Sequence, residues 1–493
     1  MTLQTQKNTH KPFKWVIGIP YFVQGTSYFT EVPILYFIKN VLALGDTGGQ
    51  LFNSLRSLGW LIKPVWGYIS DRIPLYGYRR KSWYILMACL ALGFWSFSAG
   101  LSLAGVRIPL LYLFVFNFAF TTYAFVDVVC DALMVERGRH LNQVGSFINF
   151  QWTVLGLATA AAIYLGGWVQ QQILVEKFEY WIVFLLTGIP PLATAYVGWR
   201  YIEETPVPHQ IELPQSVPSW QRIRLFLQSL PHRFSQFRAN NRVIWFLVLF
   251  MFFWKFSPSI GFIERSYLID VRHFRPTSFG TILSVGGITF FLSVLTYRWV
   301  VNRYHSISWD QYLYAVVTLA VISFPLSFYL YLHPQHPWWN AFDVFNSWPE
   351  NLNPLPEWNR YEWFRLLFQT FFGFATIPAF IIPLTLAGET VKLQYAGVGY
   401  AFLMSLANVT DMFEGVIGAG LYTLFGNPSM AWLLSSFSGS WLDIAGVPDE
   451  RTLILQIFVY ISMVTTLLTI PFILLLKREF DRQGIAITLG EMK

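Results

Sequence analysis

Long apolar runs separated by short polar segments dominate the pattern of this chain. A helix needs about 20 apolar residues to cross the hydrocarbon core of a bilayer. The runs that are long enough to be predicted as spans cover residues 13–41, 51–70, 83–104, 108–135, 144–169, 180–202, 243–269, 279–300, 311–332, 363–386, 398–425 and 453–476. The pattern therefore predicts an all-α integral membrane protein with twelve transmembrane helices.

The polar segments between the runs differ in charge. Most of the 34 Lys and Arg residues lie near the two ends of the chain and in alternate loops. Cytoplasmic loops of membrane proteins carry an excess of Lys and Arg, so we expect both termini to be cytoplasmic. The first residues, 1–15, lack the features of a cleaved signal peptide, so the first span is expected to stay as an anchor. These features predict a multi-pass protein of the cell (inner) membrane, with an organelle membrane as the alternative.

Two of the loops are long. Residues 203–241 begin rich in proline and continue with apolar side chains at helical spacing and arginines between them. The apolar residues of this pattern are Trp220, Ile223, Phe226, Leu227, Leu230, Phe234 and Phe237. This pattern is typical of a basic amphipathic helix that lies on the inner face of a membrane. Residues 333–362, rich in Pro, Trp and Asn, are expected to form an outer loop.

The chain also repeats itself weakly. Shifting it by about half its length superposes similar residues in the same order, such as Gly59 on Gly286. Such a repeat favours two related halves of six helices each. We therefore predict an N-terminal bundle (1–202), a cytoplasmic amphipathic linker (203–241) and a C-terminal bundle (242–493).

The composition supports a membrane protein and argues against other classes. The chain is 54% hydrophobic and 12% charged, whereas soluble domains carry about 25% charged residues. The net charge of +7 is better explained by cytoplasmic loops than by nucleic-acid binding. Cys89 and Cys130 lie in apolar runs and do not form a metal-type spacing. The sequence has no phosphate-binding Gly-rich loop and no HExxH or CxxC pattern, so we expect no enzyme, no metal and no cofactor.

Three motifs carry a resemblance to a known family. Residues 67–72, GYISDR, followed by the basic residues 79–81, resemble the loop motif between spans two and three of major-facilitator proteins. The longer strings IKPVWGYISDRIPLYGYRRKSWYIL and DVVCDALMVERGR, with Val23-Gln24-Gly25 in the first span, resemble the folate–biopterin transporter family. The resemblance covers the N-terminal half well and the C-terminal half loosely. It implies the major-facilitator fold and alternating-access transport of folates, pterins or related compounds, coupled to protons, through a path between the halves.

Asp127 and Asp131 are four residues apart, so they share one face of the fourth predicted span. Two carboxylates in one low-dielectric site cannot easily both ionise, so one of them is expected to carry a proton. This predicts a proton-coupling pair. The alternative is a structural ion pair with Lys63 or Arg56, which would keep both carboxylates ionised.

Charged residues inside other spans are candidates for substrate binding, because an ionisable group in a membrane is costly unless paired or hydrated. Arg56 and Lys63 are seven residues apart, so a continuous helix would place them on one face. They are expected to attract the carboxylates of a folate tail. Glu31 is a candidate for binding the amino groups of a pterin or for taking a proton. The alternative for Arg56 and Lys63 is a salt bridge to Asp127, Asp131 or Glu31, and the alternative for Glu31 is a carboxylate near the outer interface.

The seventh predicted span, which repeats the first, adds Lys255 and Arg265 to the candidates. Lys255 aligns with Gln24, and both are expected to line the cavity wall. Asp411 and Glu414 are three residues apart in the eleventh span and are the expected counter-charges of the seventh.

A cluster of charges at the inner membrane edge is predicted to act as a gate. It consists of Asp71, Arg79, Arg80, Glu136 and Arg139. Such a network would latch the two halves together and break when the cavity opens inward. The alternative is that the arginines only set the topology, which would leave Asp71 unexplained.

The expected partners are an anionic small-molecule substrate, protons and the lipid bilayer, without nucleic acid, and the expected state is a monomer. Two alternatives remain open. The chain could carry another small organic solute, or it could be a non-transporting assembly or pigment-carrier protein on the same scaffold. Buried charges on several facing spans favour transport over the second alternative.

Overall fold

The computed structural model describes residues 3–56, 58–141, 144–205, 242–256, 260–304, 308–332, 334–346, 355, 357–376, 382, 396–430, 432 and 450–483. Within these residues the chain is almost entirely helical, and a β-bridge between Leu75 and Tyr78 closes a short turn. The predicted all-α class is therefore confirmed.

The first group of helices, which we call the N-terminal set, lies before residue 202. It consists of α1 (Leu3–Ser27), α2 (Glu31–Tyr36), α3 (Asp46–Leu55), α4 (Lys63–Arg72), α5 (Lys81–Leu103), α6 (Pro109–Leu141), α7 (Val144–Leu174), α8 (Tyr180–Gly188) and α9 (Pro191–Tyr201). Short turns of tighter or wider helix connect some of them, at Tyr28–Thr30, Phe37–Val41 and Leu58–Trp60.

The second group, the C-terminal set, begins at residue 242. It consists of α11 (Arg242–Lys255), α12 (Gly261–Asp270), α13 (Pro276–Arg303), α14 (Trp309–Ser327), α15 (Asn340–Asn346), α16 (Arg360–Thr376), α18 (Ala396–Phe425), α20 (Glu450–Leu467) and α21 (Ile470–Gln483). Each predicted span overlaps at least one of the helices in the two sets. The predicted amphipathic helix of residues 220–237 lies outside the described residues.

Several predicted spans are broken helices. The span predicted at 51–70 divides into α3 and α4, and Lys63 is the first residue of α4, with Pro64 beside it in the first turn. Gly59, in the turn between them, packs so closely on α6 that a Cβ atom there would lie 2.1 Å from Oγ1 of Thr121. The break therefore allows a close approach to α6, and it corrects the expectation of one continuous helix through Arg56 and Lys63. Pro190 and Pro191 divide α8 from α9 in the same way.

The lengths of the helices fit a membrane protein. Among the described residues, the helices long and apolar enough to cross a bilayer are Lys81–Leu103, Pro109–Met134, Phe150–Leu174, Tyr180–Tyr201, Pro276–Ser293 and Glu450–Arg482. Trp245–Trp254 and Trp309–Ile322 are apolar but shorter. Broken spans such as α3 and α4 do not reach this length in one piece, so twelve spans remain consistent with the structure.

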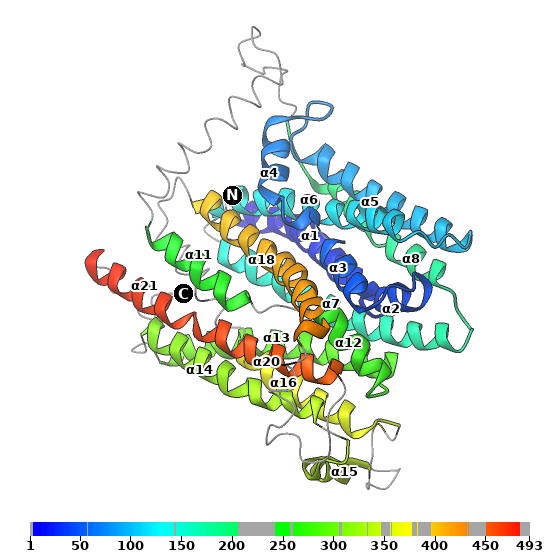
Figure 1. The fold of residues 1–493 in the computed structure, drawn as a ribbon. Coiled ribbons are helices and arrows are strands. Elements are labelled where there is room, and N and C mark those ends of the chain that lie inside the picture. The colour runs from blue at the N-terminus through cyan, green and yellow to red at the C-terminus, as the bar shows by residue number, and fades with distance from the viewer. Residues whose placement is uncertain are drawn as a thin grey trace.

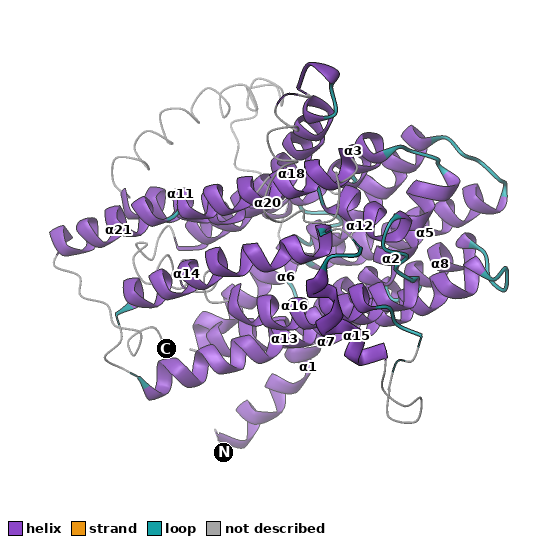
Figure 2. Cartoon of the chain, turned by 60° about the horizontal axis from the view of Figure 1, so that its bottom comes forward, coloured by secondary structure: helices purple, strands orange, loops and turns teal. Residues whose placement is uncertain are grey.

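The helices lie side by side, and the two sets pack against each other (Figures 1 and 2). The starts of α1 and α11 and the end of α21 lie at one end, toward the upper left of Figure 1, which we call the near end. The opposite end, which holds α2, α12 and α15, is called the far end.

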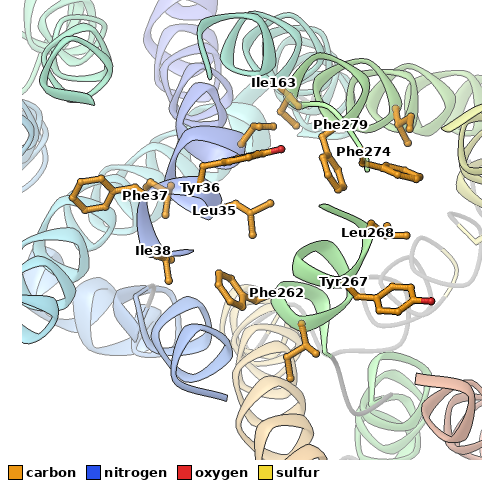
Figure 3. Packing of buried hydrophobic residues seen from close by; sticks show 14 of the residues in the cluster. Leu35, Tyr36, Phe37, Ile38, Ile163, Phe262, Tyr267, Leu268, Phe274 and Phe279 are labelled. Atoms are coloured by element: carbon orange, nitrogen blue, oxygen red, sulfur yellow. The ribbon is translucent and has the colours of Figure 1, made fainter. Parts of the chain in front are cut away.

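An apolar cluster joins the two sets at the far end. Leu35 and Ile38 from the first predicted span lie opposite Phe262 and Leu268 of α12, and Phe279 of α13 completes the group (Figure 3). All five side chains are buried. Because burial of apolar area stabilises a contact, this far-end cluster holds the two sets together where it lies.

Candidate functional site

Glu31 lies where the two helix sets meet, and two arginines bind its carboxylate. Its chain position is the start of α2, directly after the tight turn Tyr28–Thr30. Arg56, at the end of α3, donates from Nη2 to Oε2 at 2.8 Å. Arg265, in α12, donates from Nη1 to Oε1 at 2.6 Å. The carboxylate thus links one arginine of its own set to one of the other set, and the predicted candidates Glu31, Arg56 and Arg265 come together.

The surroundings of Arg56 leave part of its guanidinium unused. Its Cζ lies 5.5 Å from the centre of the Phe120 ring, which favours a cation. Its Nη1 is buried and has no hydrogen-bond partner among the described atoms. A buried donor without an acceptor is rare in proteins. The site therefore offers more positive hydrogen-bond donors than Glu31 alone uses.

Lys63 and Asp127 form a second charged group, which lies inside the N-terminal set. The Nζ atom of Lys63 donates to Oδ2 of Asp127 at 2.6 Å and lies 4.7 Å from the centre of the Trp60 ring. The Asp127 side chain is only 5% exposed. Asp127 and Gln24 also line a cavity of about 10 Å³, which is room for about one water molecule. The ion pair that the sequence left as an alternative is therefore formed in this conformation.

Asp131 has a different partner from Asp127. Both lie on α6, as the spacing predicted, but Asp131 accepts a hydrogen bond of 2.7 Å from the hydroxyl of Tyr21 in α1. Lys63 neutralises Asp127, whereas the hydroxyl of Tyr21 brings no charge to Asp131. The two carboxylates are thus chemically distinct, although their sequence positions look equivalent.

Arg56 and Lys63 do not act as the single pair that their spacing predicted. The break between α3 and α4 separates them, and each has its own carboxylate partner, Glu31 for Arg56 and Asp127 for Lys63. The expectation of one shared helix face is therefore wrong, because Gly59 and Pro64 interrupt the helix that it assumed.

The seventh predicted span is only partly described. The side chain of Lys255 lies outside the described residues. Arg265 binds Glu31 rather than its predicted counter-charges Asp411 and Glu414. The neighbouring Glu264 pairs with Arg365 of α16 at 3.3 Å and accepts a hydrogen bond of 3.0 Å from Tyr331. Adjacent residues of α12 thus face different partners, one across the sets and one within the C-terminal set.

The charges at the near end form contacts within the N-terminal set. Arg80 donates from Nη2 to Glu136 at 2.9 Å and from Nη1 to Ser70 at 3.0 Å. Both partners belong to the same set, so this pair is not a latch between the sets. The side chains of Asp71 and Arg139, which were predicted to take part, lie outside the described residues.

Sequence reasoning missed Glu204, which lies close to Arg79 and Arg80. Its carboxylate accepts hydrogen bonds from the backbone N–H groups of Arg79, Arg80 and Lys81, at 2.8 to 3.2 Å, where α5 begins. A carboxylate at a helix N-terminus satisfies free N–H groups and is favoured by the helix dipole. Its distance in sequence from α5 explains why local capping rules did not find it.

A second group that the sequence did not single out crosses the two sets at the far end. Lys39 binds Asp270 at 2.7 Å, and Arg451 binds Asp270 at 3.3 Å and Asp46 at 3.1 Å. Tyr422 also donates to Asp46 at 3.0 Å. We call Lys39, Asp270, Arg451 and Asp46 the far-end ion chain. All four lie near the ends of predicted spans, where isolated charges are common. Only the fact that they include both positive and negative side chains could have indicated that they form ion pairs.

The backbones of α7 and α13 approach each other closely beside the far end. A Cβ atom on Gly167 would lie 2.6 Å from the carbonyl oxygen of Pro276 and 2.7 Å from the Cα atom of Gly280. Both neighbours are backbone atoms, so no side chain could move aside. Gly167 and Gly280 are therefore what allows this helix crossing between the sets. Apolar packing, ion pairs and glycine contacts together close the far end in this structure.

Comparisons with known proteins agree with this description. A model of the BT1 family matches residues 24–332, more than half of the chain. A curated relative, the folate-biopterin transporter of Synechocystis sp., is 30% identical over 292 residues, which is 56% of this chain and 54% of that protein. Folate transporter 1 of Plasmodium falciparum is 22% identical over 56% of this chain and 50% of its own length. The chain thus spans about half the length of these relatives, which are named as transporters and not as enzymes.

Solved structures show the same fold over nearly the whole chain. The nucleoside transporter NupG has a TM-score of 0.58 and 14% identity, covering 93% of this chain and 99% of its own. The POT family transporter PepTSo has a TM-score of 0.63 and 10% identity, covering 96% of this chain and 99% of its own. These likenesses show the fold alone, the major-facilitator fold that the motifs implied. The family itself is shown by the match to the family model: the chain belongs to the BT1 family.

Proposed function

We propose that this protein is a secondary active transporter of folate- or pterin-like compounds that works by alternating access. The observation that carries this proposal is Glu31 held between Arg56 and Arg265, at the meeting point of two helix sets in a BT1 family member. Arginine is suited to the carboxylates of a folate because its planar fork donates two parallel hydrogen bonds. The names of the family relatives support the substrate class.

The proposed substrate path runs between two bundles, residues 1–202 and 242–493. Arg56, Arg265 and Glu31 would contact the substrate first, with Lys63 and Gln24 on the N-terminal wall and Lys255 on the C-terminal wall. Rocking of one bundle against the other would alternate access to this site. Because the far end is closed in this structure, we assign it to the part of the cycle in which the site opens toward the near end.

We propose that coupling is to protons, through Asp127 and Asp131. Lys63 stabilises the charged form of Asp127, whereas a neutral hydroxyl contacts Asp131. A proton can thus bind Asp131 without breaking an ion pair, and the two acids can have different roles in the cycle. The electrochemical gradient would then drive uptake, with a monomer as the working unit.

The near end is proposed to be cytoplasmic, with both termini inside the cell. Arg79, Arg80 and Glu136 lie at this end, where basic residues are expected on the cytoplasmic side. With Asp71 and Arg139, they would form the inner gate when the near end closes. The membrane is proposed to be the cell membrane, since nothing in the argument needs an organelle.

Uptake tests the proposal. The full chain is expressed in a host that cannot import folate, and labelled folate uptake is followed with and without an uncoupler. We expect uptake that the uncoupler abolishes, and we expect Asp131→Asn to reduce it while membrane insertion stays intact. An absence of uptake of folate, biopterin and close analogues from a correctly inserted protein would overturn the substrate assignment. Uptake that ignores the uncoupler would overturn proton coupling alone.

A second candidate is transport of another small organic anion on the same site. The two arginines favour it, because they recognise a carboxylate rather than a pterin ring. Competition of labelled folate by unrelated carboxylates, stronger than by biopterin, would favour this candidate. A non-transporting assembly or pigment-carrier role would leave every one of these solutes outside the cell.

A further inference from the structure

We infer that Glu31 acts as an internal carboxylate that occupies the anion site of the transporter and competes there with the carboxylate of a folate-type substrate. This inference rests on the proposed function and adds how the site distinguishes its ligands. It predicts that ligands with a carboxylate depend on Glu31, Arg56 and Arg265, while pterins without a carboxylate do not.

The geometry of the three residues supports an exchange. Each oxygen of the Glu31 carboxylate accepts from one arginine, Oε2 from Arg56 at 2.8 Å and Oε1 from Arg265 at 2.6 Å. A substrate carboxylate has the same two oxygens, the same charge and the same planar shape, so it can satisfy the same donors. Charge-assisted hydrogen bonds of this kind are among the strongest in proteins. The two arginines would therefore bind either carboxylate strongly, and the two carboxylates compete for them.

The unused donor of Arg56 points to a ligand with more acceptors than Glu31. Its Nη1 is buried without a hydrogen-bond partner among the described atoms, although its Nη2 is satisfied. A ligand carboxylate approaching along the fork of Arg56 could accept from both nitrogens, which Glu31 does not do here. Leaving a buried donor unsatisfied is costly, so a ligand that satisfies it gains binding free energy.

The site is partly exposed, and the single negative charge of Glu31 does not balance the two positive charges of Arg56 and Arg265. The Arg265 side chain is 27% exposed and the Glu31 side chain 18%, whereas Asp127 in the N-terminal set is nearly buried. A solute between the two sets would therefore meet Arg265 first and then displace Glu31.

Competition explains how an anionic ligand would be linked to movement. The Glu31–Arg265 contact joins α2 to α12, that is, one set to the other. A ligand carboxylate that takes Arg265 breaks this contact and replaces it with its own. Because Glu31 is tethered at the site, a ligand must outcompete a high effective concentration of carboxylate. The native protein is thus expected to bind folate more weakly than the two arginines alone would allow.

Removing the internal carboxylate tests the inference. Folate, which carries carboxylates, and biopterin, which has none, are titrated calorimetrically into the purified full-length protein and into Glu31→Gln. We expect Glu31→Gln to bind folate about tenfold more tightly or better, because hydrogen bonds to charged groups have that magnitude. Biopterin affinity should change less than about twofold, because biopterin has no carboxylate and so cannot make the charged contact that accounts for the tenfold change in folate affinity. Glu264→Gln, which removes another carboxylate from the same helix as Arg265, is the matched control and should change neither affinity.

A second variant keeps the inference falsifiable if Glu31→Gln is unstable. Arg265→Gln should weaken folate about tenfold or more and leave biopterin nearly unchanged. Equal changes for the two ligands in both variants would overturn the inference while leaving the proposed function intact. Binding of neither ligand, by any of these folded proteins, would overturn the proposed function and the inference with it.

Discussion

The crossing of α7 and α13 yields the sharpest test of the proposed cycle. We predict that Gly167→Ala shifts the protein away from the conformation with a closed far end. The added Cβ would lie 2.6 Å from the carbonyl oxygen of Pro276, 2.7 Å from the Cα of Gly280 and 3.0 Å from its nitrogen. Carbon atoms in good contact are about 3.5–4.0 Å apart, so the helices must separate by about 1 Å.

The size of the effect follows from that overlap. Inserting a methyl group into a tightly packed contact costs about 1–3 kcal/mol. The cost applies only to the conformation in which α7 and α13 touch here, so it changes the equilibrium between two conformations rather than the whole fold. A change of that size alters the ratio of the two populations by about 5- to 150-fold.

Thiol labelling measures the shift. Leu268 lies in the far-end cluster and is 1% exposed, so a cysteine placed there reacts only when the far end opens. The exposed Cys89 is first replaced by alanine to remove background labelling. We expect a charged, membrane-impermeant thiol reagent to label Leu268→Cys about 5- to 150-fold faster in the Gly167→Ala background, the same population shift applied to labelling.

Gly156→Ala provides a matched control on the same helix. No atom lies within 4 Å of the position that its Cβ would take, so it adds a methyl group to α7 without a clash. It also reproduces the gain in helix propensity that Ala has over Gly, which is about 1 kcal/mol. If both variants label at the same rate as the parent, the α7–α13 crossing does not restrain the far end, and the reasoning from the glycine contact is refuted.

Three further predictions concern charges. Lys63→Met should lower the melting temperature sharply, because it leaves the buried Asp127 without its partner, a loss of about 3–5 kcal/mol. The double variant Lys63→Met with Asp127→Asn should recover most of this loss. Equal melting temperatures for the single and the double variant would contradict the prediction. Arg451→Gln should speed labelling of Leu268→Cys by about fivefold, because the pairs of Arg451 with Asp46 and Asp270 are part-exposed and contribute about 1 kcal/mol. High salt, which screens the same pairs, should speed labelling similarly in the protein that keeps Arg451. Glu204→Gln should destabilise the start of α5 by about 1 kcal/mol in thermal unfolding, whereas Glu203→Gln should not.

The positions of the spans were predictable because the apolar pattern dictates them. Length alone separates a membrane helix from a loop, and the chain has no other way to satisfy its backbone in a bilayer. The breaks were not predictable with the same certainty. Gly59 and Pro64 both signalled an interruption, yet apolar residues on either side, such as Trp60 and Leu61, made the run look continuous.

The pairing of the charges was only partly predictable. A charge inside a membrane span is costly unless it is paired, so the sequence analysis kept ion pairing of Lys63, Arg56 and Asp127 as an alternative to a functional role. It could not choose among the pairs, because the choice depends on where a helix ends and on which helices of the other set lie opposite. Arg265 illustrates this: its expected partners were Asp411 and Glu414, which lie on α18, but it pairs with Glu31 of α2.

The ion pair beside the proposed coupling site and the ion pairs that close the far end differ in exposure. Lys63 and Asp127, both in one set, are 12% and 5% exposed. Lys39 with Asp270 and Arg451 with Asp46, which cross between the sets, have side chains 20% to 38% exposed. Separating a buried pair leaves charges without water and costs several kcal/mol, whereas a part-exposed pair costs about 1 kcal/mol or less. The buried pair therefore suits a rigid bundle, and the part-exposed pairs suit the proposed cycle, in which the far end would close and open again.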